Sequence, residues 1–186
     1  MPSTDSIVPI EELMDRVRTL TTPYRLAHIF RVADLAARIG SANDADPEKA
    51  YIAGLLHDAA RDLSDAAILE LVEPETEWER SHPRSLHGRA GRVLAQSFGI
   101  RDNDVLEAIE GHVYGVDRRN KVGMAVFVAD TAEPGRGVNH GIRELALAGQ
   151  LEAAYAEALR QKLAYLKGKG VDPHPRTVLA YAQVSS

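Results

Sequence analysis

AYIAGLLHDAAR, residues 50–61, is an apolar segment that ends in an adjacent histidine and aspartate. Before it, Asp46 has the side chain of a helix N-cap, and Pro47 is the residue favoured in a first helical turn. Apolar side chains then recur at helical spacing up to His57 and Asp58. These two polar side chains lie about 100° apart on a helix and can both reach one point near its end. The segment therefore predicts a buried helix that presents a histidine and a carboxylate together.

Helical periodicity extends over almost the whole chain. Ala, Leu, Glu and Arg are frequent, and the alternation typical of half-buried strands is scarce. Helices are predicted near residues 10–20, 23–40, 46–58, 65–72, 85–98, 103–112, 122–133, 140–167 and 175–183. The stretches 73–84 and 115–121 are predicted as loops because turn-forming and polar residues replace the periodic pattern. The sequence thus predicts an all-α fold, a single helical bundle.

The composition is that of a globular protein with an aliphatic core, since 45% of the residues are hydrophobic, 26% charged and 5% aromatic. A length of 186 residues suits one domain, predicted over residues 1–186. No stretch approaches the roughly 20 apolar residues of a membrane span, and the first residues lack a basic region leading into an apolar one. A cytoplasmic location is therefore predicted.

Charge and cysteine content narrow the classes of function. The net charge is −5, with basic residues scattered among acidic ones, which argues against a nucleic-acid duplex as partner because duplex binding needs a basic face. The chain has no cysteine, which excludes disulfides, thiolate catalysis and sulfur-ligated zinc. Any metal ion must therefore be held by histidine and carboxylate side chains.

Polar side chains also interrupt other apolar helical segments. His28 and His112 each share a face with apolar residues at helical spacing, His87 lies in a predicted first turn, and Asp130 lies within the apolar segment MAVFVAD. A single histidine on an apolar face is usually a hydrogen-bonded core residue. Together with the histidine and aspartate at the end of the quoted segment, however, these groups would be costly to bury unless a metal satisfied them. The set therefore predicts a metal site.

The six polar residues occur in the order His28, His57, Asp58, His87, His112 and Asp130. His28, the pair His57-Asp58 and Asp130 resemble the pattern of the HD superfamily of metal-dependent phosphohydrolases. The two additional histidines, His87 and His112, imply its two-metal branch. Longer motifs resemble the YqeK-type symmetrical dinucleoside tetraphosphate hydrolases, with a match over about residues 24–181. These motifs are RLAH (25–28), GLLHDAAR (54–61), LHGRAG (86–91), HVYG (112–115), ADTAEPGR (129–136), IREL (142–145) and HPRTVLAY (174–181).

The resemblance implies two metal ions that share one carboxylate. One ion would be held by His28, His57, Asp58 and Asp130, and the other by His87, His112 and a bridging oxygen of Asp58. Two ions about 3.5–4 Å apart can neutralise a polyphosphate and lower the pKa of a water between them. Iron, manganese, cobalt and zinc are all compatible with this nitrogen-rich ligand set. The resemblance points to iron.

Asp58 and Arg61 are the implied catalytic residues, and the implied substrate contacts are Arg61, Arg136, Arg25 and Gly115. Arg61 lies one helical turn beyond His57, so its guanidinium can reach phosphate oxygens. The alternative for Arg61 is a surface ion pair with Asp62 or Asp65. For Arg136 the alternative is a salt bridge with Glu133, and for Arg25 it is pairing with a core carboxylate.

The chain departs from the YqeK-type pattern at two places near these contacts. The family has lysine at the position of Arg61 and two threonines at the positions of Val113 and Tyr114. These departures concern the substrate contacts and leave the predicted metal ligands intact. Three other histidines, His82, His140 and His174, lie beside prolines, a glycine or a loop and are predicted as surface or capping residues.

The resemblance implies symmetrical hydrolysis of diadenosine tetraphosphate and related dinucleoside polyphosphates into two nucleoside diphosphates. An HD-type nucleotidase or phosphodiesterase is one alternative, since it would share every metal ligand. A non-catalytic nucleotide-binding regulator is another, although a metal site with positions open to water is the catalytic arrangement. A partner-binding helical scaffold with a structural metal is the remaining alternative, and in the other cases the partner is a small molecule. The sequence does not determine the oligomeric state and is compatible with a homodimer.

Overall fold

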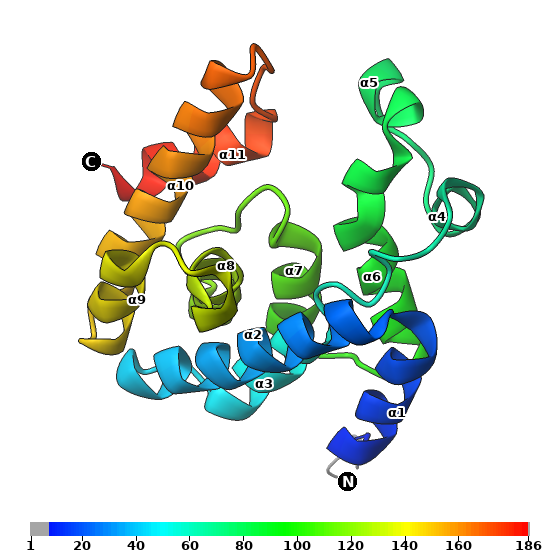
Figure 1. Cartoon of the computed structure of the whole chain (residues 1–186), viewed down its shortest axis with the longest axis horizontal. Helices are drawn as coiled ribbons and strands as arrows, with labels where there is room; N and C mark the ends of the chain where they lie inside the picture. Colours follow the sequence, from blue (N-terminus) through cyan, green and yellow to red (C-terminus); the bar gives the residue numbers. More distant parts are fainter. Residues whose placement is uncertain (1–7, 186) are drawn as a thin grey trace, which may run out of the picture.

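Helices alone make up the regular structure of residues 8–185, the part of the chain that the computed structural model describes (Figure 1). The predicted all-α fold is therefore confirmed. The α-helices are α1 (Ile10–Leu20), α2 (Pro23–Ala42), α3 (Pro47–Leu56), α4 (Asp65–Leu71), α5 (Glu77–Ser81), α6 (His87–Ser97), α7 (Asn103–Gly111), α8 (Lys121–Ala132), α9 (His140–Leu147), α10 (Leu151–Gly168) and α11 (Pro175–Val184). Two short 3-10 helices, η1 (Pro83–Leu86) and η2 (Pro134–Arg136), precede α6 and follow α8.

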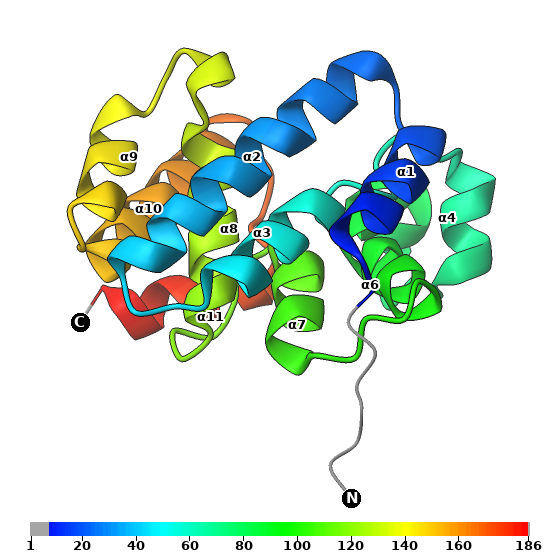
Figure 2. The same cartoon turned by 90° about the horizontal axis from the view of Figure 1, so that it is seen from below.

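The helices α2, α3 and α8 form the centre of the molecule (Figures 1 and 2). α8 is buried over almost its whole length and contacts α2, α3, α7 and α10. In Figure 2, α9, α10 and α11 lie on one side of this centre, and α1, α4 and α6 lie on the other. Among the described residues, none of the helices combines the length and the apolar character that crossing a membrane requires.

The packing of α3 against α2 depends on a glycine. A Cβ atom at Gly54 would lie 2.8 Å from the Cα atom of Ala33, a distance at which the two helices would have to separate. Without that atom the helices pack closely, and the rings of His28 and His57 come within 5.5 Å of each other, centroid to centroid. The glycine in the middle of the quoted segment thus positions the histidine at its end.

Several boundaries differ from the sequence prediction; α2, for example, continues past Gly40 to Ala42, and α3 ends at Leu56 rather than at Asp58. Residues 73–84, predicted as a loop, contain α5 and the start of η1, because the Thr76 side chain caps α5 by accepting a hydrogen bond from the Glu79 N–H. These helices are too short to produce a visible periodicity. Residues 140–167, predicted as one helix, are divided into α9 and α10 near Gly149, whose φ of 82° favours glycine. The predicted helix 85–98 begins only at His87, after η1.

Candidate metal centre

The six predicted ligands converge at the ends of helices that lie far apart in the sequence. They are His28 on α2, His57 at the end of α3, Asp58 in the turn after α3, His87 at the start of α6, His112 just after α7 and Asp130 near the end of α8. All of them are buried except Asp130, which is partly exposed. The convergence agrees with the pattern of the sequence.

The first ligand group comprises His28, His57, Asp130 and the Oδ2 atom of Asp58. The Nε2 atom of His28 lies 3.1 Å from Asp130 Oδ1 and 4.0 Å from Asp58 Oδ2. The Nε2 atom of His57 lies 3.9 Å and 3.7 Å from the same two oxygens. Two imidazoles and two carboxylates therefore face one point.

The second ligand group comprises His87, His112 and the other carboxylate oxygen of Asp58. The two Nε2 atoms are 3.0 Å apart. Asp58 Oδ1 lies 3.3 Å from His87 Nε2 and 3.4 Å from His112 Nε2. The two oxygens of one carboxylate thus face two different groups of histidines, which is the bridging arrangement that the resemblance implies.

Every histidine of the two groups is oriented through its Nδ1 atom. The Nδ1–H groups of His57, His87 and His112 donate to backbone carbonyls of Gly54, Arg84 and Ile109, at 2.6, 2.7 and 2.7 Å respectively. The Nδ1–H group of His28 donates to a carboxylate oxygen of Glu133 at 3.1 Å. Because carbonyl and carboxylate oxygens only accept, the proton of each neutral ring is on Nδ1 and the lone pair is on Nε2.

This orientation leaves hydrogen-bond acceptors facing one another. The Nε2 atoms of His28 and His57 are buried without a hydrogen-bond partner among the described residues. The Nε2 atoms of His87 and His112 meet the carboxylate of Asp58 with no donor between them. Buried lone pairs so arranged are costly unless a cation satisfies them. The donor set, imidazole nitrogens and carboxylate oxygens with outer hydrogen bonds, fits transition-metal ions.

The pKa values of four of the predicted ligands favour the forms that bind metal. For His28, burial acts to lower the pKa, but the hydrogen bonds with Asp130 and Glu133 outweigh it and raise the pKa. Burial lowers the pKa of His57 to about 4, against the opposing effect of Asp58. Burial also lowers the pKa of His87. For Asp58 and Asp130, burial acts to raise the pKa, but the neighbouring histidines outweigh it and hold the pKa of both carboxyls well below the usual range. Neutral imidazoles and ionised carboxylates are the protonation states that a metal ion requires.

A cavity of about 650 Å³ opens over the ligands, and we call it the central cavity. Its size lies within the range of roughly 300–1,000 Å³ found for ligand pockets. Several cations line it, namely Arg25, Arg31, Arg61, Arg136 and Lys162. Such a lining suits a ligand that carries several negative charges.

Arg61 lines the central cavity and makes no ion pair within residues 8–185. The carboxylates predicted as its alternative partners are engaged elsewhere. Asp62 accepts hydrogen bonds from the backbone and side chain of Thr22 and lies near Arg25. Asp65 pairs with Arg84 at 3.4 Å. The guanidinium of Arg61 is therefore available to a ligand.

Arg25 and Arg136 each pair with a carboxylate of the first ligand group. Arg25 Nη1 lies 2.7 Å from Asp58 Oδ2, and Arg136 Nη2 lies 2.5 Å from Asp130 Oδ1. The alternative partner of Arg136, Glu133, is bound instead by Arg31. Both arginines lie at the edge of the central cavity.

Three further residues of the site were not identified from the sequence as functional. Glu133 is buried and accepts hydrogen bonds from His28, from Arg31 at 2.7 Å, and from the backbone N–H of Gly135. Lys162 reaches the central cavity from α10 and donates to the carbonyl of Val113. The ADTAEPGR motif contained a signal for Glu133, because a glutamate two residues before a glycine can cap the turn. Arg31 and Lys162 had no such signal, since each looks like a surface residue of an amphipathic helix.

Gly115 does not line the central cavity. Its φ is 107°, a left-handed conformation that favours glycine. A Cβ atom at this position would lie 2.9 Å from the Cβ atom of Ala180 and 3.0 Å from the hydroxyl of Tyr155. Gly115 therefore allows the loop after α7 to pack against α10 and α11.

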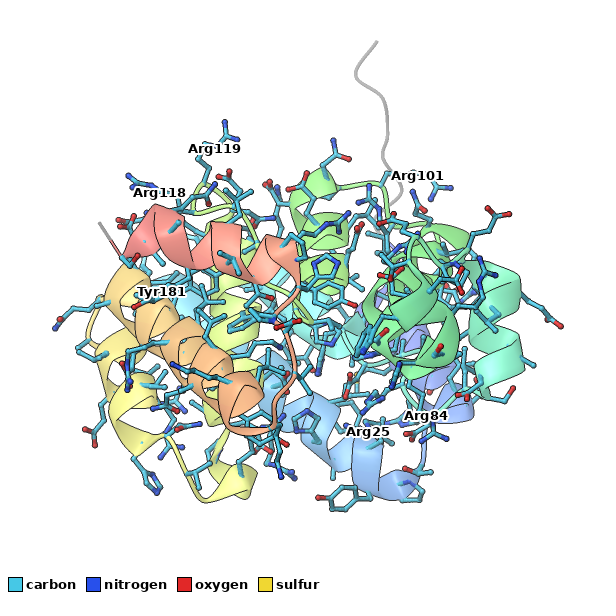
Figure 3. The ribbon with its side chains drawn as sticks, turned by 90° about the horizontal axis from the view of Figure 1, so that it is seen from above. Arg25, Arg84, Arg101, Arg118, Arg119 and Tyr181 are labelled. Atoms are coloured by element: carbon cyan, nitrogen blue, oxygen red, sulfur yellow. The ribbon has the colours of Figure 1, made fainter. Side chains whose placement is uncertain are left out.

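The structure also shows where the neighbours of Gly115 and the three remaining histidines lie. Val113 lines the central cavity, whereas Tyr114 stacks on His174 with ring centroids 3.9 Å apart. His82 and His140 are exposed, and the His174 side chain caps α11, so all three have the surface or capping positions predicted for them. In Figure 3 the loop arginines Arg118 and Arg119 lie at the edge of the molecule opposite to Arg25.

Comparison with known proteins agrees with this geometry. The sequence model of the HD domain matches residues 25–135, a range that contains all six predicted ligands. This chain belongs to the HD domain family. A crystal structure described as a predicted HD superfamily hydrolase involved in NAD metabolism from Clostridium acetobutylicum superposes with a TM-score of 0.87 at 30% identity, covering 95% of this chain and 97% of that one.

Relatives with a named activity cover much of the sequence. A symmetrical bis(5'-nucleosyl)-tetraphosphatase of Staphylococcus aureus is 30% identical over 162 residues, 83% of each protein. The protein of the same name in Bacillus subtilis is 28% identical over 178 residues, 92% of this chain and 95% of the relative. A probable nicotinate-nucleotide adenylyltransferase/Ap4A hydrolase of Mycoplasma genitalium is 29% identical over 127 residues, and the match covers only 36% of that longer protein.

Proposed function

We propose that this chain hydrolyses diadenosine tetraphosphate and related dinucleoside polyphosphates symmetrically, with two nucleoside diphosphates as products. The activity named for the Staphylococcus aureus and Bacillus subtilis relatives supports this proposal. The observation that carries it is the position of Asp58, whose two carboxylate oxygens face two separate groups of histidines below a cavity lined by cations.

The ligand groups leave positive charge for a polyphosphate. Four of the six predicted ligands are imidazoles, which carry no charge in the form that binds metal, and only one of the two carboxylates, that of Asp58, is shared between the two positions. Two metal ions held there would offset the charge of the phosphates and supply a water of lowered pKa as the nucleophile. The chain itself sets the distance between the two positions, because a single carboxylate, that of Asp58, faces both groups.

The cations of the central cavity would hold the phosphates in place. Arg61 has no ion pair among the described residues, so its guanidinium can donate to phosphate oxygens in a fork-like manner. Burial lowers the pKa of Lys162, and the negative charge of Asp130 acts to raise it. Arg31 and Glu133 act indirectly, since they orient His28.

Symmetrical cleavage requires attack at one of the two central phosphorus atoms. An oxygen from water bonds to that phosphorus, the bond to the central bridging oxygen breaks, and the second half leaves as ADP with the bridging oxygen. The water proton passes to solvent or to the leaving phosphate. We propose iron as the native metal because of the resemblance to the YqeK-type enzymes, with manganese, cobalt and zinc as the alternatives. We also propose a cytoplasmic location, which suits a substrate this highly charged.

Product analysis tests the proposal directly. The purified protein is supplied with iron, manganese, cobalt or zinc in turn and incubated with diadenosine tetraphosphate in ¹⁸O-labelled water. We expect early products that are ADP with little AMP or ATP, and label in only one of each pair of ADP molecules. AMP and ATP in equal amounts would place the cleavage one phosphate away from the centre.

The same preparations separate the two alternative functions. Preferential turnover of nucleoside monophosphates or cyclic nucleotides would indicate a nucleotidase or phosphodiesterase. Tight nucleotide binding with no turnover under any of the four metals would indicate a non-catalytic regulator.

A further inference from the structure

A second cavity, of about 390 Å³, lies beside the central cavity. Arg61 and His87 line both cavities, so the two adjoin at these residues. The other walls come from the start of α4, from α5 and from η1, and they include Trp78, His82 and Arg84. We call this space the Trp78 cavity. In Figure 1, α5 lies beyond the start of α6, the helix that begins with the ligand His87.

A flat aromatic pair forms one wall of the Trp78 cavity. The rings of Trp78 and His82 are stacked, with centroids 4.5 Å apart and an angle of 13° between their planes. A hydrogen bond of 2.9 Å between His82 Nδ1 and the Trp78 carbonyl holds the histidine ring in this position. The indole is nevertheless 48% exposed, an unusual position for the only tryptophan of the chain. An exposed, fixed aromatic face next to a cavity is the platform on which nucleobases stack.

Cations connect this platform to the metal centre. Arg61 stands between the two cavities without an ion pair among residues 8–185, and Arg84 lies on the far wall of the Trp78 cavity. Arg84 pairs only loosely with Asp65, at 3.4 Å and with both side chains exposed. Figure 3 shows Arg84 and Arg25, which lines the central cavity, on the same side of the molecule. A polyphosphate chain that extends from the metal centre past Arg61 would therefore enter the Trp78 cavity.

We propose that the Trp78 cavity binds the second nucleoside of the substrate, with its base stacked on Trp78. This inference rests on the proposed function, because only a ligand with a nucleoside at each end of its polyphosphate needs a site on both sides of the metals. The central cavity holds one nucleoside diphosphate half, and the other half passes Arg61 and ends on the aromatic pair. Because every base has a stacking face, this end of the site tolerates different bases.

Fluorescence of the single tryptophan gives a direct measurement. The metal-loaded protein is titrated with a diadenosine tetraphosphate analogue whose central bridging oxygen is replaced by methylene, so that it is not cleaved. We expect saturable quenching of the Trp78 emission. Inorganic tetraphosphate, which has no base, should leave the emission unchanged. Binding of the analogue, measured by calorimetry, without any change of emission would overturn the proposal.

Kinetics of two variants provide a second test. Trp78→Ala should raise KM for diadenosine tetraphosphate about tenfold, the size expected for loss of one base stack, with kcat nearly unchanged. Trp78→Phe should restore most of the affinity, because phenylalanine keeps an aromatic face. Tyr165→Ala, which removes another exposed aromatic side chain, serves as the matched control and should have no effect. An unchanged KM for Trp78→Ala would contradict a base site on this residue.

The two proposals fail in different ways. If the protein cleaves symmetrically but its emission is not quenched and its Trp78→Ala variant is unimpaired, the proposed function stands. The second nucleoside site is then rejected. Loss of the proposed function would show as absence of cleavage by the unmodified protein under all four metals. In that case the analogue titration still decides whether the Trp78 cavity binds a base.

Discussion

The first and second ligand groups share Asp58 but differ in charge and in what supports them. The first group has two carboxylates, and its His28 is held by the buried Glu133, which is in turn bound by Arg31. The second group has two histidines and only one carboxylate oxygen. Both of its rings are oriented by backbone carbonyls alone.

This difference predicts two metal positions of unequal strength. An ion in the first group meets more carboxylate oxygens, whose charge Arg25 and Arg136 offset in part, and a histidine made more basic by its carboxylate partner. An ion in the second group meets mostly neutral nitrogen and keeps more of its positive charge for the substrate. The comparison therefore suggests that the first group retains its ion and that the second group is the more easily emptied.

The largest expected effect comes from the residue that the groups share. Asp58→Ala should remove both ions or leave one bound weakly, and should lower turnover by more than about a hundredfold, since loss of an outer partner alone typically costs about 10–100-fold. Elemental analysis for metal per chain and the rate of diadenosine tetraphosphate cleavage measure it. The control is Asp34→Ala, at an exposed carboxylate of α2. Retention of both ions and of the full rate would disprove the two-metal arrangement.

His112→Ala separates the two groups. We expect this variant to lose the ion of the second group and most of the activity while it keeps the ion of the first group, so that metal analysis finds one ion per chain. His140→Ala, at an exposed histidine, should keep both. If His112→Ala loses both ions together, the groups are not independent and their comparison does not hold.

Glu133→Gln weakens the support of the first group only. The glutamine can still accept from His28 but has lost the charge that raises the basicity of the ring, so affinity for the first ion should fall by about 10–100-fold. Competition with a chelator measures this affinity, and Glu152→Gln is the exposed control. Selective loss of the second ion in Glu133→Gln would reverse the assigned order of strength.

The smallest effect is expected where a residue serves the substrate and neither ion. Arg61→Ala should lower kcat/KM about tenfold, the cost of one charge-assisted hydrogen bond, with an unchanged metal content. Arg61→Lys should retain much of the activity, because the YqeK-type family has lysine here. Arg38→Ala, at an exposed arginine of α2, is the control. Unchanged kinetics of a folded Arg61→Ala variant would return Arg61 to a surface role.

The sequence by itself determined the helical fold and predicted the six residues that converge in the two ligand groups. Helical periodicity and caps such as Asp46 before Pro47 are local properties, which depend on residues a few positions apart. The ligands could be predicted because a histidine or an aspartate within an apolar helix is costly to bury alone. That cost is independent of which helices meet, so the six residues could be recognised before their contacts were known.

Only the tertiary structure decided how charged side chains of distant segments pair. A salt bridge between Arg136 and Glu133, which lie close together in the chain, was the alternative to a substrate contact, yet Glu133 binds Arg31 of α2 and Arg136 binds Asp130. Lys162 enters the central cavity from α10, and α5 brings the aromatic pair beside the metal centre. A long charged side chain can reach several oppositely charged residues, and the sequence pattern does not show which of them it binds. The packing of the helices selects one of them, because it alone sets which groups lie within reach and away from water.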